Sequence, residues 1–288
     1  MKKINSKALD YHAFPQPGKL SVSSSKTCDT AEDLSLAYTP GVAEPVLEIV
    51  KDPKNAYRFT NKGNLVAVIT NGTAVLGLGN TGALASKPVM EGKAVLFKRF
   101  ADIDVYDIEI DCEDPDEFIQ TVVNISPTFG GINLEDIAAP ECFYIESELK
   151  KRLSIPVFHD DQHGTAVIVA AGLINALEIQ QKLIEKVKIV FLGAGAAGCS
   201  CARLLKLMGA TDITMVDSKG ILTNDRKDLN QYNHDLAIDT KGKTFNDAIQ
   251  HADVFIGVSG ANLLKNEHVK SMSKNPIIFA LANPDPEM

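Results

Sequence analysis

Two pairs of adjacent acidic residues stand out as candidates for chemistry. Glu135-Asp136 and Asp160-Asp161 each come directly after a short apolar run that predicts a strand. In open α/β sheets, ligands bind at the carboxyl ends of the strands. Four carboxylates gathered there would repel one another unless a cation lay among them, and hard oxygen ligands favour Mg²⁺ or Mn²⁺. The alternative is that each pair only caps a following helix.

A glycine-rich loop in the second half of the chain predicts a dinucleotide site. An apolar run leads into a predicted helix through Gly193-Ala194-Gly195-Ala196-Ala197-Gly198. In this pattern the glycines allow a tight turn, close approach of a pyrophosphate and close packing of helix on strand. Asp217 ends the next predicted strand, about 20 residues later, where a carboxylate accepts from ribose hydroxyls. This acid favours NAD, and the nearby Lys219 keeps NADP as the alternative.

A second Gly-x-Gly-x-x-Gly pattern, at Gly77, Gly79 and Gly82, lacks this context. Pro88 interrupts any helix after it, and no acid follows at the right distance. We expect a backbone turn that lets a small ligand approach, rather than a second cofactor loop.

Other polar residues near these motifs have simple structural explanations. His159 and His163 flank the second acidic pair, and we expect them to be structural rather than zinc ligands. Lys93 precedes a strand predicted at 94–97, and Tyr38 lies in a predicted turn. From sequence alone, the simplest interpretation is that Lys93 is a solvated lysine and that Tyr38 is a packing residue.

The elements that position these residues alternate between strand and helix. This alternation predicts an α/β protein with largely parallel sheets, preceded by an arm at 1–30. Strands are predicted at 64–69, 73–78, 94–97, 132–137, 155–158, 186–192, 212–216, 254–258 and 277–281. Asn71-Gly72 predicts a hairpin between the first two strands. Helices are predicted at 116–124, 141–153, 165–177 and 199–208.

Composition excludes several classes of protein. The length of 288 residues suggests two domains, and 45% hydrophobic with 23% charged residues is typical of a globular protein. The formal net charge of −8 disfavours nucleic-acid binding. The most apolar stretch, 165–177, is too short to span a membrane. Five cysteines without a Cys-x-x-Cys pair predict a reduced, cytoplasmic protein.

Taken in order, five motifs resemble those of the malic enzymes, most closely the short bacterial type. They are Leu36-Ala-Tyr38-Thr-Pro-Gly41-Val-Ala, Gly92-Lys93, Leu134-Glu135-Asp136-Ile, Phe158-His-Asp160-Asp161-Gln-His-Gly164-Thr and Ala282-Asn283-Pro284. The resemblance covers residues 20–288. It implies a substrate and metal domain at 1–160 and a Rossmann-type NAD(P)-binding domain at 161–288.

The resemblance also implies a role for each matching residue. Tyr38 matches the general acid, Lys93 the general base, and Asp160 the carboxylate beside that lysine. Metal-ligating carboxylates are matched by Glu135, Asp136 and Asp161. A substrate-binding asparagine is matched by Asn283, and the cofactor loop and ribose acid by Gly193 to Gly198 and Asp217.

The implied reaction is oxidative decarboxylation of L-malate to pyruvate and CO₂, with NAD or NADP and Mg²⁺ or Mn²⁺. To act as a base, Lys93 needs a lowered pKa, which metal charge and desolvation would supply. The resemblance also implies a homodimer, in which Tyr38 reaches the partner's site, and a chain that continues past Met288. Larger members carry an arginine in the glycine turn at 76–81, where this sequence has none. The alternatives are an oxaloacetate decarboxylase and a non-catalytic NAD-binding module.

Overall fold

The computed structural model describes residues 6–75, 77–283 and 285–288. Its strands are β1 (Leu65–Thr70), β2 (Asp104–Glu109), β3 (Gly131–Leu134), β4 (Val157–His159), β5 (Lys188–Leu192), β6 (Asp212–Asp217), β7 (Gly220–Ile221), β8 (Val254–Gly257) and β9 (Ile277–Ala280). Its α-helices are α1 (Ser6–Ala13), α2 (Ala31–Ala37), α3 (Ala43–Lys51), α4 (Ala56–Phe59), α5 (Ala83–Ala101), α6 (Pro115–Ile125), α7 (Glu141–Arg152), α8 (Asp160–Gln180), α9 (Ala196–Leu207), α10 (Phe245–Ile249) and α11 (Asn266–Ser271).

The strands form two sheets. The first has the order β2-β1-β3-β4, and all of its pairs are parallel. The second has the order β7-β6-β5-β8-β9 and is parallel except for the short β7, which pairs antiparallel to β6. The predicted α/β class with largely parallel sheets is therefore confirmed.

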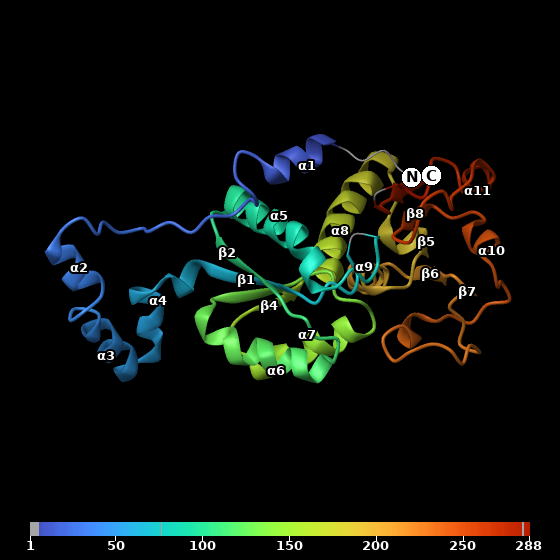
Figure 1. Ribbon diagram of the computed structural model, residues 1–288. Coiled ribbons are helices and arrows are strands. Elements are labelled where there is room, and N and C mark those ends of the chain that lie inside the picture. The colour runs from blue at the N-terminus through green and yellow to red at the C-terminus, as the bar shows by residue number, and fades with distance from the viewer. Residues whose placement is uncertain (1–5, 76, 284) are drawn as a thin grey trace.

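Helices cover the sheets and join them. In Figure 1, α5 lies on one face of the first sheet, and α6 and α7 lie on the other. The long α8 follows β4 and packs against α9, the helix that follows β5 of the second sheet. One buried apolar cluster runs from β1 and β3 through α8 and α9 into β5 and β8, so both sheets share a core. No described helix is long and apolar enough to cross a membrane.

The structure corrects the prediction around α5. The strand expected at 94–97 is part of this helix, and Pro88 lies inside it. The buried residues of α5 are spaced by three or four positions, which is the period of a helix packed on one side. Because Pro88 is exposed, its ring and its missing N–H lie away from that packed face. The next strand of the sheet, β2, has no counterpart among the predicted strands.

The strand predicted at 73–78 and the hairpin predicted at Asn71-Gly72 are also wrong. Gly72 has a φ of +70°, but its carbonyl accepts hydrogen bonds from the backbone N–H groups of Thr81 and Gly82. The chain therefore folds back on itself and leads into α5. A single bridge joins Val75 to Gly79 within this loop, and Leu76 lies outside the described residues.

The N-terminal helices stand apart from the core. In Figure 1, α2 and α3 project beyond the end of the first sheet. None of the residues of α1 to α4 is buried, and large apolar side chains such as Leu36, Tyr38 and Val50 are exposed. The expectation that the described part of the arm contains no core element is consistent with this exposure.

Candidate active site

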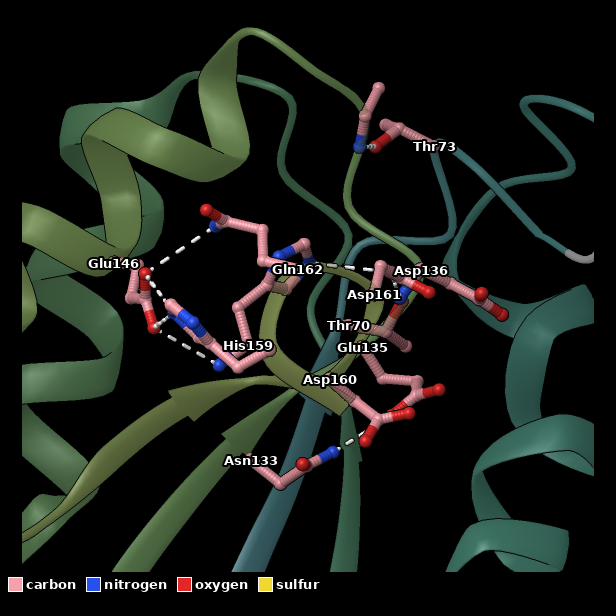
Figure 2. A network of polar contacts seen from close by, with 12 residues as sticks. Thr70, Thr73, Asn133, Glu135, Asp136, Glu146, His159, Asp160, Asp161 and Gln162 are labelled. Atoms are coloured by element: carbon pink, nitrogen blue, oxygen red, sulfur yellow. Dashed lines mark hydrogen bonds and ion pairs between the residues drawn. The ribbon is translucent and has the colours of Figure 1, made fainter. Parts of the chain in front are cut away.

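Carboxylates converge at the carboxyl ends of neighbouring strands of the first sheet. Glu135 and Asp136 follow β3 directly, and Asp160 and Asp161 form the first turn of α8, directly after β4 (Figure 2). One ligand atom from each of Glu135, Asp136 and Asp161 lies within 4.8 Å of the others. The sequence predicted that this helix begins after Gly164, but it begins at Asp160. The second acidic pair therefore lies at the helix N-terminus.

The backbone around Asp136 is held in an unusual conformation. Asp136 has a φ of +53°, in the left-handed region that few residues other than glycine adopt. Its backbone N–H donates to Oδ2 of Asp161 at 3.0 Å, and its carbonyl accepts from the N–H of Ala74 at 3.0 Å. The hydroxyl of Thr73 accepts from the N–H of Ala138 at 2.9 Å. These bonds tie the β3 end to both α8 and the loop at 71–82.

The cluster has the electrostatics of a cation site. Burial raises the pKa of Glu135 to about 8, although the charge of Lys93 lowers it, and Asp160 and Asp161 raise it further. The side-chain amide of Asn133 donates to Oε2 of Glu135 at 2.9 Å. A cation among the three carboxylates would favour the ionised form of Glu135. Three oxygen donors of this kind are the ligands that Mg²⁺ and Mn²⁺ prefer, so the residues present fit such an ion.

Lys93 joins this cluster from α5. Its Nζ donates to Oδ2 of Asp160 at 2.7 Å and lies 3.0 Å from Oε1 of Glu135. Burial lowers the pKa of Lys93, but the charges of Glu135 and Asp160 outweigh burial and raise it. The lowered pKa expected of a base is therefore not what the protein side chains alone produce.

Tyr38 is not brought to this cluster within one chain. It follows the last residue of α2, and its side chain is 70% exposed. In Figure 1, α2 lies well apart from α5 and α8, which carry Lys93 and Asp160.

A buried acid that sequence reasoning missed supports the first turn of α8. In Figure 2, the carboxylate of Glu146, on α7, lies beside this turn. It accepts from the backbone N–H of His159 at 3.2 Å and from the side chain of Gln162 at 3.4 Å, and it lies 2.8 Å from Nε2 of His163. Burial raises the pKa of Glu146, but His163 and Lys150 outweigh it, so the pKa is lowered. No sequence pattern links Glu146 to the acidic pair.

Each of the two histidines near the cluster contacts an acidic side chain. His159 is fully buried, and its Nε2 lies 3.3 Å from Oδ2 of Asp161. His163 packs against Glu146 one turn into α8. His159 therefore contacts an acid of the cluster, Asp161, and His163 contacts Glu146, which supports the start of α8.

The glycine loop of the second sheet has the shape of a phosphate-binding turn. Gly193 follows β5 directly and has a φ of +121°, and α9 begins just after Gly195. A Cβ at Gly195 would meet nothing within 4 Å, which leaves space in front of the loop. A Cβ at Gly198 would lie 2.0 Å from the carbonyl oxygen of Gly193, so only glycine allows α9 to pack this closely on the strand.

Asp217 ends β6, as predicted, but its carboxylate is already paired. Arg226 donates to Oδ1 from Nη1 at 2.9 Å and to Oδ2 from Nη2 at 2.7 Å. The backbone N–H of Lys219 donates to Oδ1 at 2.8 Å. Burial raises the pKa of Asp217, but these bonds outweigh it and lower the pKa. Arg226 is a second residue that sequence reasoning missed.

Asn283 lies in the segment that follows β9 and is exposed, and the adjoining Pro284 lies outside the described residues. The buried Glu287 holds this segment in place. Its carboxylate accepts from the backbone N–H groups of Ser259 and Ala282, both at 3.0 Å. The turns after β8 and β9 are thus linked at the carboxyl edge of the second sheet.

Comparison with known proteins gives the family. Residues 17–150 match the model of the malic enzyme N-terminal domain, and residues 162–288 match that of the malic enzyme NAD binding domain. The chain is 59% identical to an NADP-dependent malic enzyme of Halomonas elongata, over 98% of this chain and 67% of that protein. It is 56% identical to an NADP-dependent malic enzyme of Escherichia coli K12, over 99% of this chain and 38% of that protein.

A solved structure agrees with the sequence matches. The NAD-dependent malic enzyme from Thermotoga maritima is 44% identical, with a TM-score of 0.92 over 99% of this chain and 76% of that one. The chain thus spans between about two-fifths and three-quarters of these relatives. With both family models matched across two sheets that meet in one core, the chain belongs to the malic enzyme family.

Proposed function

We propose that this chain catalyses the oxidative decarboxylation of L-malate to pyruvate and CO₂, with reduction of NAD⁺ or NADP⁺. The observation that carries the proposal is the contact of the Lys93 amine with Asp160 and Glu135, at the edge of a sheet whose neighbour bears the glycine loop. The activities in the names of the relatives support it. A module that only bound a cofactor would need neither a partly buried amine nor three converging acids.

Glu135, Asp136 and Asp161 are the residues that would hold a divalent ion, Mg²⁺ or Mn²⁺. When bound, the ion supplies a Lewis acid that polarises the oxygen on C2 of the substrate. The backbone N–H of Asp136 donates to Oδ2 of Asp161 and so holds the Asp161 carboxylate beside the end of β3.

Lys93 takes the proton from the C2 hydroxyl while hydride leaves C2 for the nicotinamide ring. Asp160 holds the amine at 2.7 Å and so fixes the direction from which it receives the proton. To accept this proton, Lys93 must be neutral, and its burial favours the neutral form. The opposing influence of Glu135 is reduced when that carboxylate is shared with a cation.

Tyr38 donates a proton to C3 of the enol that remains when CO₂ leaves, and Asn283 binds a substrate carboxylate. Because Tyr38 follows α2, which lies apart from the helix α5 that carries Lys93, we propose a homodimer in which Tyr38 completes the partner's site. The exposed apolar side chains of α2 and α3 support burial of this face against a second copy.

We place the boundary between the two domains at residues 160 and 161, where the first sheet ends and α8 begins. The cofactor then lies on Gly193 to Gly198, with its ribose near Asp217. The five free cysteines suit a reducing compartment, and we propose the cytoplasm.

An absorbance assay tests the reaction. With L-malate, Mn²⁺ and NAD⁺ or NADP⁺, we expect reduced nicotinamide to accumulate, and a chelator should stop it. Loss of CO₂ from oxaloacetate with no reduction by malate would identify a decarboxylase instead. Tight cofactor binding without either reaction would identify a binding module.

A further inference from the structure

The pairing of Asp217 with Arg226 changes what the end of β6 can bind. Both carboxylate oxygens of Asp217 face the same guanidinium, at 2.7 and 2.9 Å. The side chain of Arg226 is 15% exposed and that of Asp217 is 25% exposed, so water screens this pair only in part. An acid held in this way is not the bare carboxylate that would repel an extra phosphate.

Neighbouring charges complete a balanced group. Arg226 also binds Asp228, from Nε at 3.0 Å and from Nη2 at 2.7 Å. Asp228 in turn accepts from Nζ of Lys219 at 2.8 Å. Two acids and two bases therefore form one network with no formal net charge. If a neutral residue replaced Arg226, two carboxylates and a single lysine would remain.

The position of this network is that of the adenosine ribose in dinucleotide-binding sheets. The acid at the end of the second strand accepts from the 2′-hydroxyl of NAD, whereas a nearby arginine accommodates the 2′-phosphate of NADP. This chain has both residues, and the arginine holds the acid. We propose that Arg226 determines cofactor specificity: it neutralises Asp217 and so admits an adenosine ribose that carries a 2′-phosphate.

The inference rests on the cofactor part of the proposed function and needs none of the malate chemistry. Its test uses two probes without nicotinamide, adenosine 2′,5′-bisphosphate and 5′-AMP, titrated into the full chain by calorimetry. We expect the wild-type chain to bind the bisphosphate more tightly. In Arg226→Gln, affinity for the bisphosphate should fall at least about tenfold relative to 5′-AMP, because the 2′-phosphate then faces Asp217 without the guanidinium that neutralises it.

Two further variants keep the result interpretable. Arg203→Gln removes another arginine–aspartate pair, with Asp235, on the helix of the glycine loop, and the ratio of the two affinities should not change. Asp217→Asn removes the acid that competes for Arg226, and it should raise the preference for the bisphosphate. This second change also tests the proposal should Arg226→Gln not fold.

An unchanged affinity ratio in Arg226→Gln, or a ratio that does not rise in Asp217→Asn, would overturn the inference. Such a result with normal malate turnover would leave the proposed reaction intact. The expected ratios without malate turnover would instead overturn the reaction and leave the role of Arg226 standing.

Discussion

Gly164 lies directly against the carboxylate of Asp160, one turn back along α8. A Cβ built on Gly164 would lie 2.3 Å from Oδ1 of Asp160 and 2.9 Å from its Cγ, closer than any side chain tolerates. The other oxygen of Asp160 accepts from Lys93 at 2.7 Å. The missing side chain at position 164 therefore lets Asp160 lie where it holds the amine of Lys93.

Gly164→Ala should lower the activity of the chain without lowering its stability. The added methyl group displaces the Asp160 carboxylate from Lys93, and a misplaced catalytic group costs about 10- to 100-fold in kcat. Alanine also favours a helix interior over glycine by up to about 1 kcal/mol, so the unfolding temperature should not fall. Steady-state kinetics and thermal unfolding measure the two effects.

Gly92→Ala is the matched control for this variant. It makes the same exchange in α5, beside Lys93, and its Cβ would meet only Cε of Lys19, at an ordinary 3.9 Å. Turnover should stay close to that of the wild-type chain. Equal loss of turnover in both glycine variants would show that the Asp160 contact is not the cause.

Lys93→Ala should remove the proposed base. Loss of a positioned acid or base lowers turnover about 10²- to 10⁴-fold, whereas binding of NADPH, measured by fluorescence, should change little. Lys98→Ala provides the control, because Lys98 lies in the last turn of the same helix and pairs with the exposed Asp102 and Asp104. If Lys93→Ala kept near-normal turnover, the base would have to be another residue.

The fold was predictable wherever burial leaves a clear pattern along the chain. The central strands β1, β5 and β8 are almost wholly buried, so the sequence of each is a run of mostly apolar residues. The edge strand β2 contains three acidic residues and is only partly buried, and it was not predicted. In α5, a local run of apolar residues suggested a strand, whereas packing on one face of the sheet selects the helix.

The site was predictable only where topology alone brings residues together. Strand ends of a parallel sheet meet at one edge, and this rule places Glu135 near Asp161. Glu146 lies inside a helix, and Arg226 lies in an irregular segment, so no spacing rule connects either to its partner. In the proposed dimer, Tyr38 would meet Lys93 only through the pairing of two chains, and no spacing rule within one chain relates the two residues.

Glu146→Gln should weaken metal binding without unfolding the chain. The amide keeps the shape of Glu146 but removes the charge that holds His163 and the start of α8. Groups that orient metal ligands typically contribute 10- to 100-fold to metal affinity, and we expect about tenfold weaker Mn²⁺ binding by electron paramagnetic resonance. Glu148→Gln changes a more exposed acid on the same helix, paired with Lys151, and should bind Mn²⁺ normally. Equal affinities in the two variants would contradict the role of Glu146.

Glu109 should make the stability of the chain depend on pH. Burial and the neighbouring Asp107 raise the pKa of Glu109 from 4.5 to about 7, although Lys87 opposes this. The folded state therefore holds an extra proton between these values, and the free energy of unfolding falls as the pH rises through this window. The loss should be on the order of 1–2 kcal/mol, because Glu109 is only partly buried and solvent screens it.

Urea unfolding at pH 5 and pH 8 measures this dependence. Glu109→Gln should flatten it and should be more stable than the wild-type chain at pH 8. Glu113→Gln removes the same charge from an exposed site nearby and should leave the slope unchanged. A slope in Glu109→Gln equal to that of the wild-type chain would assign the effect to another group.

Mixing two inactive variants tests whether Tyr38 serves the partner's site. Tyr38→Phe and Lys93→Ala are each expected to lose most turnover. If Tyr38 acts across the dimer, a hybrid has one site with both residues intact, so an equimolar mixture, unfolded and refolded together, should recover about a quarter of wild-type turnover. If Tyr38 acts within its own chain, every site in the hybrid lacks one residue, and the mixture stays inactive. Refolding each variant alone gives the baseline, and sedimentation velocity shows whether dimers have formed.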